Sequence, residues 1–211
     1  MLITFEGVEG GGKTTQMRLL AERLALERGL RNVLLTREPG DGPLGQELRR
    51  LALHPPMDIP VDARAELFLM LADRAQHVGQ VIGPHLAAGG IVLCDRYGDS
   101  SVAYQGYGRE LDAAHIQSLN QFATQGLAPH LTVLLDLDPA LGLARQHERS
   151  RMEEERLPFH QRVRAGFLAL ARGEPERFAV INAARPIDTV QADVWAAVAS
   201  RLPALSQPSV A

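Results

Sequence analysis

The segment that most constrains this chain is GVEGGGKTTQ at residues 7–16, because Gly7, Gly12, Lys13 and Thr14 have the spacing G-x-x-x-x-G-K-[ST]. A strand-like apolar segment precedes it and a long helical pattern follows. Glycines let successive backbone N–H groups approach a phosphate, and the N-terminus of the following helix adds its positive end. Lys13 supplies a charge for the β- and γ-phosphates, and the Thr14 hydroxyl is placed to bind Mg²⁺. The segment therefore predicts a loop that binds the phosphates of a nucleoside triphosphate.

The overlapping glycines Gly7, Gly10 and Gly12 also resemble a dinucleotide fingerprint, but the Lys-Thr pair argues against that interpretation. The 211 residues, 45% of them hydrophobic, are enough to bury one core, so we expect a single domain over residues 1–211. A net charge of -3 gives no reason to expect nucleic acid as a partner. No apolar run approaches the ~18 residues that span a bilayer. Cys94, the only cysteine, lies in an apolar stretch and predicts a buried thiol in a reducing, cytoplasmic protein.

Short apolar segments alternate with helical patterns along the whole chain. The expected strands are residues 2–6, 33–36, 91–95, 131–136 and 178–181. The expected helices are residues 13–28, 44–53, 62–88, 113–125, 139–147, 157–171 and 186–202. Apolar strands that alternate with helices predict an α/β fold, a doubly wound sandwich with a five-stranded parallel sheet flanked by helices. We expect the tail at residues 203–211 to be frayed.

In such a sheet ligands bind at the carboxyl ends of the strands, and polar residues follow several of the predicted strands. Arg37 follows the second strand and suits capture of a second phosphate, or alternatively forms an ion pair with Glu38. Asp95 ends the third strand, where it is expected either to assist Mg²⁺ or to cap the next helix. Arg96 adds a positive charge near the transferred group. These residues predict one cleft for two phosphate-bearing molecules.

Two further segments have polar patterns. Ser101, Tyr104 and Gln105 fall within about one helical turn, where hydroxyl and amide groups can bind a nucleobase. Residues 145–156 are dense in both charges, which is typical of a solvated helix and also of a lid that brings arginines over phosphates. Composition alone leaves both interpretations of this segment open.

Four motifs in order resemble those of bacterial thymidylate kinases: residues 5–15, 36–40, 95–97 and 101–106. The resemblance extends from residue 2 to about residue 199. It implies a P-loop NTPase-type fold and transfer of the γ-phosphate of ATP to dTMP, giving dTDP and ADP in dTTP biosynthesis. It also implies Mg²⁺ as a cofactor and a homodimer.

The resemblance assigns roles by matching position. The residues that would bind ATP are Gly7, Glu9, Gly10, Gly11, Gly12, Lys13, Thr14 and Thr15. The metal would lie near Thr14, Glu9 and Asp95. Glu9 would also face the acceptor's sugar, and Arg37 and Arg96 would bind its phosphate. The thymine would lie against Arg74, Ser101 and Gln105, while Tyr104 would crowd the 2′ position.

The chain departs from the family pattern at three places. Met70 stands where an aromatic residue is common, with Phe68 two residues earlier. Arg151 follows Ser150 where the family often has Asp, and Gly11 stands where Ala is usual. Because the loop carries no arginine, Arg149 or Arg151 is expected to supply that charge from a lid at about residues 145–156.

The sequence disfavours two other functions. Another nucleoside or nucleotide kinase is disfavoured by Arg37 and by the cluster at residues 101–105. A regulatory NTPase switch is disfavoured in its GTPase form, because the sequence has no Asn-Lys-x-Asp motif. The chemistry of the acceptor also favours a nucleoside monophosphate kinase over a nucleoside kinase. A phosphate acceptor is already anionic, with a second pKa of about 6, and needs no general base, whereas a neutral hydroxyl must be deprotonated.

Overall fold

The protein is described by a computed structural model that covers residues 1–55, 60–145 and 150–202. Its centre is a parallel sheet of five strands in the order β2-β3-β1-β4-β5. The strands are β1 (Leu2–Glu6), β2 (Val33–Arg37), β3 (Ile91–Asp95), β4 (Leu131–Asp136) and β5 (Phe178–Asn182). The predicted fold class and all five strands are confirmed, with β2 and β5 each one residue longer than expected. The tail at residues 203–211 lies outside the described residues.

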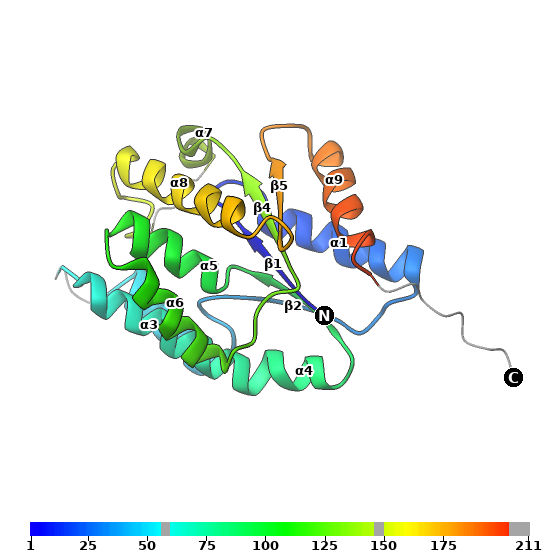
Figure 1. Cartoon of the computed structure of the whole chain (residues 1–211), viewed down its shortest axis with the longest axis horizontal. Helices are drawn as coiled ribbons and strands as arrows, with labels where there is room; N and C mark the ends of the chain where they lie inside the picture. Colours follow the sequence, from blue (N-terminus) through cyan, green and yellow to red (C-terminus); the bar gives the residue numbers. More distant parts are fainter. Residues whose placement is uncertain (56–59, 146–149, 203–211) are drawn as a thin grey trace, which may run out of the picture.

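Helices cover both faces of the sheet (Figure 1). The pair α1 (Lys13–Arg28) and α9 (Ile187–Ala199) pack side by side on one face. The other helices are α2 (Gly42–Leu53), α3 (Ala63–His77), α4 (Gly83–Ala87), α5 (Gly98–Ser101), α6 (Ala113–Thr124), α7 (Pro139–Ala144) and α8 (Leu157–Gly173), with π-helical segments η1 (Val78–Ile82) and η2 (Val102–Gly108). Of these, α2 and α6 pack on α3, and α8 packs on η2.

The helix expected over residues 62–88 was only roughly right. Asp62 precedes the helix and caps it, because its carboxylate accepts a hydrogen bond from the Arg64 N–H at 2.9 Å. The helical segment is not one α-helix but consists of α3, the π-helical segment η1 and α4 in succession. The second π-helical segment, η2, contains Tyr104 and Gln105, and such segments are frequent at functional sites.

Successive side chains along the strands point to opposite faces of the sheet, so the hydrophobic core has two clusters. On β1, Ile3 and Phe5 belong to the main core cluster, together with residues of α1, α8 and α9. Leu2 faces the other way and packs with Val92, Cys94 and other residues in a smaller cluster. Cys94 is buried and free, as expected. Because β1 is central, the loop after it emerges between β3 and β4, at the middle of the carboxyl edge.

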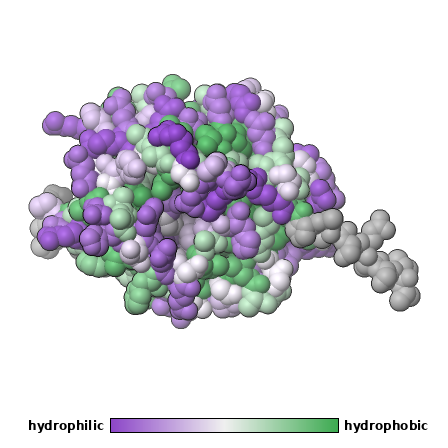
Figure 2. Space-filling model, viewed as in Figure 1, coloured by the Kyte–Doolittle hydropathy of each residue, from purple (hydrophilic) through white to green (hydrophobic). Residues whose placement is uncertain are grey.

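The surface seen in Figure 2 is mainly hydrophilic, with hydrophobic residues in separate patches. Among the described residues, no helix has both the length and the apolar character to cross a membrane.

Candidate active site

The loop between β1 and α1 packs directly on the backbone of neighbouring elements. Gly7 and Gly10 have φ angles of 133° and 69°. A Cβ on Gly7 would lie 2.4 Å from the carbonyl oxygen of Leu135, and a Cβ on Gly10 would lie 2.3 Å from that of Gly142. Only glycine permits this combination of backbone angle and close approach. The loop is therefore held against β4 and α7, at the N-terminus of α1.

Side chains further fix this loop. Lys13 is buried, and its Nζ donates to the carbonyl oxygens of Gly7 at 3.3 Å and Val8 at 3.0 Å. Burial and the nearby Arg96 lower the pKa of Lys13. Directly after α7, Arg145 Nη1 donates to the Gly10 carbonyl oxygen at 3.0 Å. Arg145 was expected only as the first residue of a lid, and the structure brings it to the loop.

Two oxygen-bearing side chains meet where the loop ends. The Thr14 hydroxyl donates to Asp95 Oδ2 at 2.9 Å, which joins the first turn of α1 to the end of β3. The alternative role for Asp95 as a helix cap is wrong, because α5 begins after Tyr97 and has no side-chain cap. A hydroxyl beside a carboxylate is a donor set that suits a hard cation such as Mg²⁺.

Glu9, the third residue expected near the metal, has different partners. Its Oε1 accepts hydrogen bonds from Arg96 Nη2 at 3.2 Å and from the Tyr104 hydroxyl. Its Oε2 lies 3.4 Å from Nδ1 of the fully buried His160. Burial alone raises the pKa of Glu9, but His160, Arg96 and Lys13 outweigh it and hold that pKa well below its usual range. Glu9 is therefore a buried carboxylate held in its ionised form.

Arg96 occupies the centre of this network with a φ of 70°, which is uncommon for a residue other than glycine and is typical of functional sites. Its Nη1 donates to the Gly7 carbonyl oxygen at 3.0 Å and to Ser100 Oγ at 3.2 Å. Its guanidinium lies 4.9 Å from the centre of the Tyr104 ring. Burial by itself lowers the pKa of Arg96, but Tyr104, Glu9 and other acidic groups raise it above the usual value.

Three arginines converge on one side of the cleft. Arg37 and Arg96 are joined by Arg49 from α2, and all three line the same cavity. Burial, together with Arg37 and Arg96, lowers the pKa of Arg49, so these guanidinium groups are close enough to repel one another. The alternative ion pair between Arg37 and Glu38 is not formed. A cluster of like charges in a cleft is typical of a binding site for a polyanion.

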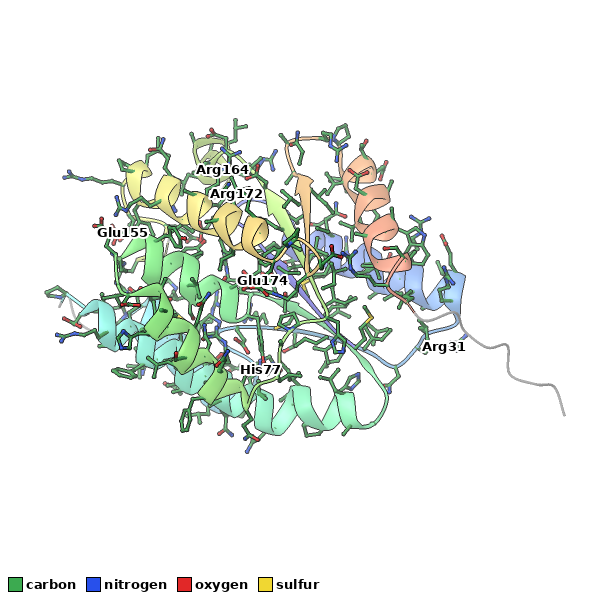
Figure 3. The ribbon with its side chains drawn as sticks, viewed as in Figure 1. Arg31, His77, Glu155, Arg164, Arg172 and Glu174 are labelled. Carbon is green, nitrogen blue, oxygen red and sulfur yellow. The ribbon has the colours of Figure 1, made fainter. Side chains whose placement is uncertain are left out.

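The Glu38 carboxylate contacts Arg74 and His77 instead of Arg37. It accepts a hydrogen bond from Arg74 Nε at 2.8 Å and lies 3.0 Å from Nδ1 of His77, which α3 presents (Figure 3). Arg74 is buried, and its remaining contacts are with Ser101 Oγ at 2.9 Å, Asn120 Oδ1 at 2.6 Å and the Tyr97 carbonyl oxygen at 2.9 Å. Arg74 is therefore fixed in one orientation in the wall of the cleft.

A single cavity of about 1080 Å³ joins these groups. Such a volume is slightly above the range of about 300–1,000 Å³ for a single small-molecule site and suits two substrates. The predicted residues that line it are Glu9, Gly10, Gly12, Lys13, Thr14, Thr15, Arg37, Met70, Arg74, Asp95, Arg96, Ser101, Tyr104 and Gln105. Met70 is among them, whereas Phe68 is 60% exposed and does not line the cavity. Gly7 and Gly11 are buried within the loop.

Comparisons with known proteins agree with this geometry. The sequence profile of the family described as thymidylate kinase matches residues 5–194. The thymidylate kinase of Solidesulfovibrio magneticus is 56% identical over 212 residues, which cover 96% of this chain and 100% of that protein. That of Deinococcus radiodurans is 50% identical, with 95% and 97% covered. This chain belongs to the thymidylate kinase family.

The fold comparison agrees with the family assignment. The crystal structure of thymidylate kinase from Ehrlichia chaffeensis matches with a TM-score of 0.76 at 36% identity, covering 94% of this chain and 98% of that one. The resemblance drawn from the four sequence motifs is thus confirmed for the thymidylate kinase family.

In the part of the chain that the structure describes, neither Arg149 nor Arg151, the two arginines expected in a lid, is observed at the main cavity. Arg149 lies outside the described residues. Arg151 does not line the main cavity: its Nη2 donates to Glu66 Oε2 at 2.6 Å and to the Ala52 carbonyl oxygen at 2.9 Å. Its role at the phosphates stays a prediction.

Sequence reasoning also missed several residues that support the site, namely Arg49, Glu66, Asn120 and His160. Arg49 had a usable signal, since it lies on the helix that follows the Thr36–Gly40 motif. The others act through neighbours distant in sequence, so no local pattern marks them.

Proposed function

We propose that this protein transfers the γ-phosphate of ATP to dTMP, giving dTDP and ADP, with Mg²⁺ as cofactor. The observation that carries the proposal is the convergence of Arg37, Arg49 and Arg96 in the cavity that also contains the phosphate-binding loop. One anion-binding loop serves a triphosphate, but a second cluster of cations in the same cleft suits an acceptor that carries its own phosphate. A regulatory NTPase has no need for that second cluster.

The donor half of the cleft is built by the loop and the start of α1. Backbone N–H groups around Gly10 and Gly12 and the Lys13 ammonium group would bind the ATP phosphates. Thr14 and Asp95, already joined by a hydrogen bond, would hold Mg²⁺. The ion would neutralise charge on the donor phosphates when bound. Arg145 holds the loop in place through Gly10.

The acceptor half is built by α2, α3 and the segment after β3. The three arginines would bind the dTMP phosphate and position it in line with the γ-phosphate, and Arg96 would stabilise charge on the transferred group. Tyr104, held by Glu9, would lie near the 2′ position of the sugar, and Glu9 near its 3′-hydroxyl. Arg74, Ser101 and Gln105 would bind the base, with Met70 covering its face.

We also propose a homodimer that pairs through α3 and α6. On α3, Phe68 is 60% exposed, and the exposed Ala72 and Ala75 extend the same face. On the adjacent α6, Phe122 is 85% exposed. Two large exposed aromatic side chains on neighbouring helices favour an interface. Light scattering on the wild type and on Phe122→Glu tests this, since the variant is expected to be monomeric.

The remaining assignments are also proposals. One catalytic domain spans residues 1–211, and a lid at about 145–156 brings Arg149 or Arg151 to the phosphates. A free, buried Cys94 suits a reducing compartment such as the cytoplasm.

The function is tested by measuring ADP release from ATP with and without dTMP. We expect release to depend on dTMP, and to fall at least ~100-fold in Lys13→Ala and Arg96→Ala without loss of the folded state. Rapid ATP hydrolysis without an acceptor would instead support a regulatory NTPase. Normal turnover in either variant would contradict the catalytic assignment.

A further inference from the structure

Glu66, a fully buried residue of α3, does not line the cavity but contacts three residues from distant segments. Its Oε1 accepts a hydrogen bond from Gln105 Nε2 at 2.8 Å, and its Oε2 accepts from Arg109 Nη2 at 3.2 Å and Arg151 Nη2 at 2.6 Å. A buried carboxylate is costly unless its partners satisfy it. The two arginines satisfy its charge, and the third partner is a residue of the candidate base pocket.

The placement of Glu66 on α3 relates it to that pocket. Glu66, Met70 and Arg74 follow one another at intervals of four residues, so they lie on one face of the helix. Opposite them, Ser101 contacts Arg74 and Gln105 contacts Glu66, again four residues apart. Met70, Arg74, Ser101 and Gln105 line the cavity, and Glu66 lies behind Gln105.

The contact determines which way the Gln105 amide faces. An ionised carboxylate can only accept hydrogen bonds, so the NH₂ group of Gln105 must point to Glu66. The amide oxygen is then turned away from Glu66, on the cavity side. Gln105 is itself 2% exposed, which leaves little freedom for the amide to rotate.

We propose that Glu66 is a positioning residue that fixes the Gln105 amide so that the pocket selects a pyrimidine with an N3–H group. This inference rests on the proposed function. Thymine and uracil carry a donor at N3, which complements the Gln105 oxygen. Cytosine carries an acceptor there, so two acceptors would face each other in a buried site, and such mismatches are rejected strongly.

The same carboxylate connects the base pocket to residues 150–155. Arg151 donates to the Ala52 carbonyl oxygen as well as to Glu66, and Arg109 pairs with both Glu66 and Glu155, which lies near the start of α8 (Figure 3). Both arginines donate to Glu66 Oε2, and Arg109 Nε also donates at 3.4 Å to Oε1, the oxygen that Gln105 binds. The arginines therefore fix the carboxylate, and the carboxylate fixes the amide.

The test compares Glu66→Gln with Glu27→Gln, which removes an exposed ion pair with Arg23 on α1 and leaves the partners of Glu66 and Gln105 unchanged. Steady-state kinetics with dTMP and dCMP as acceptors, and melting temperatures for all variants, are measured. We expect Glu66→Gln to raise the KM for dTMP about tenfold with kcat within about twofold, and to lower the preference for dTMP over dCMP about tenfold. In Glu27→Gln that preference should be unchanged.

A second variant keeps the proposal testable if Glu66→Gln does not fold. Gln105→Leu retains Glu66 with both arginines, and we expect it to lose the same preference. In the double variant the two losses should not add, because Glu66 acts through Gln105. An unchanged preference in either single variant, or additive losses, would overturn the inference while leaving dTMP kinase activity intact. A wild type that does not phosphorylate dTMP would overturn the proposed function as well.

Discussion

Replacing Gly142 with alanine tests whether the contact between α7 and the phosphate-binding loop positions the reacting groups. A Cβ built on Gly142 lies 2.2 Å from the carbonyl oxygen of Glu9, whereas ordinary contacts begin near 3.4 Å. Either α7 or the loop must therefore move by about 1 Å, because packed interiors deform little. Glu9 is part of the loop, so the displacement reaches the catalytic groups directly.

The size of the effect follows from this displacement. Overpacking costs about 1–3 kcal/mol, and the better helix propensity of alanine returns up to ~1 kcal/mol. We expect the free energy of unfolding to fall by about 1–2 kcal/mol, which leaves the protein folded at 25 °C. A misplacement of about 1 Å at a reacting centre can lower the rate ~100-fold, so kcat/KM for dTMP should fall by that order.

The assay combines urea unfolding with a coupled ADP-release measurement at saturating ATP. Gly173→Ala is the matched control, because Gly173 ends α8 and its Cβ would meet no atom within 4 Å. That variant should keep wild-type activity. Wild-type kcat/KM in Gly142→Ala would refute the argument that this contact positions the loop, and so would a loss of activity only as large as the lost folded fraction.

Three further predictions follow from the site. Burial and Asp99 raise the pKa of Glu6 from 4.5 to about 7, so the folded state binds this proton more tightly and Glu6 stabilises the protein below pH 4.5. Up to about 3 kcal/mol of this stabilisation is lost as the pH rises to 7. The free energy of unfolding, measured with urea at several pH values, should therefore depend less on pH in Glu6→Gln than in the wild type. An equal pH dependence in both proteins would contradict this. Arg49→Met should raise the KM for dTMP ~10–100-fold with little change in the KM for ATP, and equal effects on both would contradict its place in the acceptor half. Thr14→Val, but not Thr14→Ser, should raise the Mg²⁺ concentration for half-maximal rate at least ~10-fold, and an unchanged Mg²⁺ titration would remove Thr14 from the metal site.

Much of the donor half could be predicted from the sequence because its residues are consecutive. The loop glycines, Lys13 and Thr14 form one local motif, and the strand before it and helix after it have clear patterns. The ends of β2 and β3 could also be predicted, since parallel strands bring Arg37, Asp95 and Arg96 to one edge of the sheet.

The supporting residues could not be predicted in the same way. Glu66 and Arg109 are 43 residues apart, and Glu66 and Arg151 are 85 apart, so their pairing depends on how the helices pack. The charge-dense segment that contains Arg151 has a composition that fits a solvated helix equally well. Whether Met70 or Phe68 faces the cavity depends on the direction in which each side chain leaves α3, and periodicity alone did not resolve that direction.

The most direct test of the account is the rate of ADP formation from ATP and Mg²⁺ with each nucleoside monophosphate as acceptor. A cleft with a loop for ATP, three arginines for a second phosphate and a fixed amide for the base predicts that dTMP is the best acceptor and dUMP a weaker one. AMP, GMP and CMP should give rates close to those without an acceptor. A strong preference for any of these three would contradict the proposed function, and equal rates with and without every acceptor would contradict a kinase of this class.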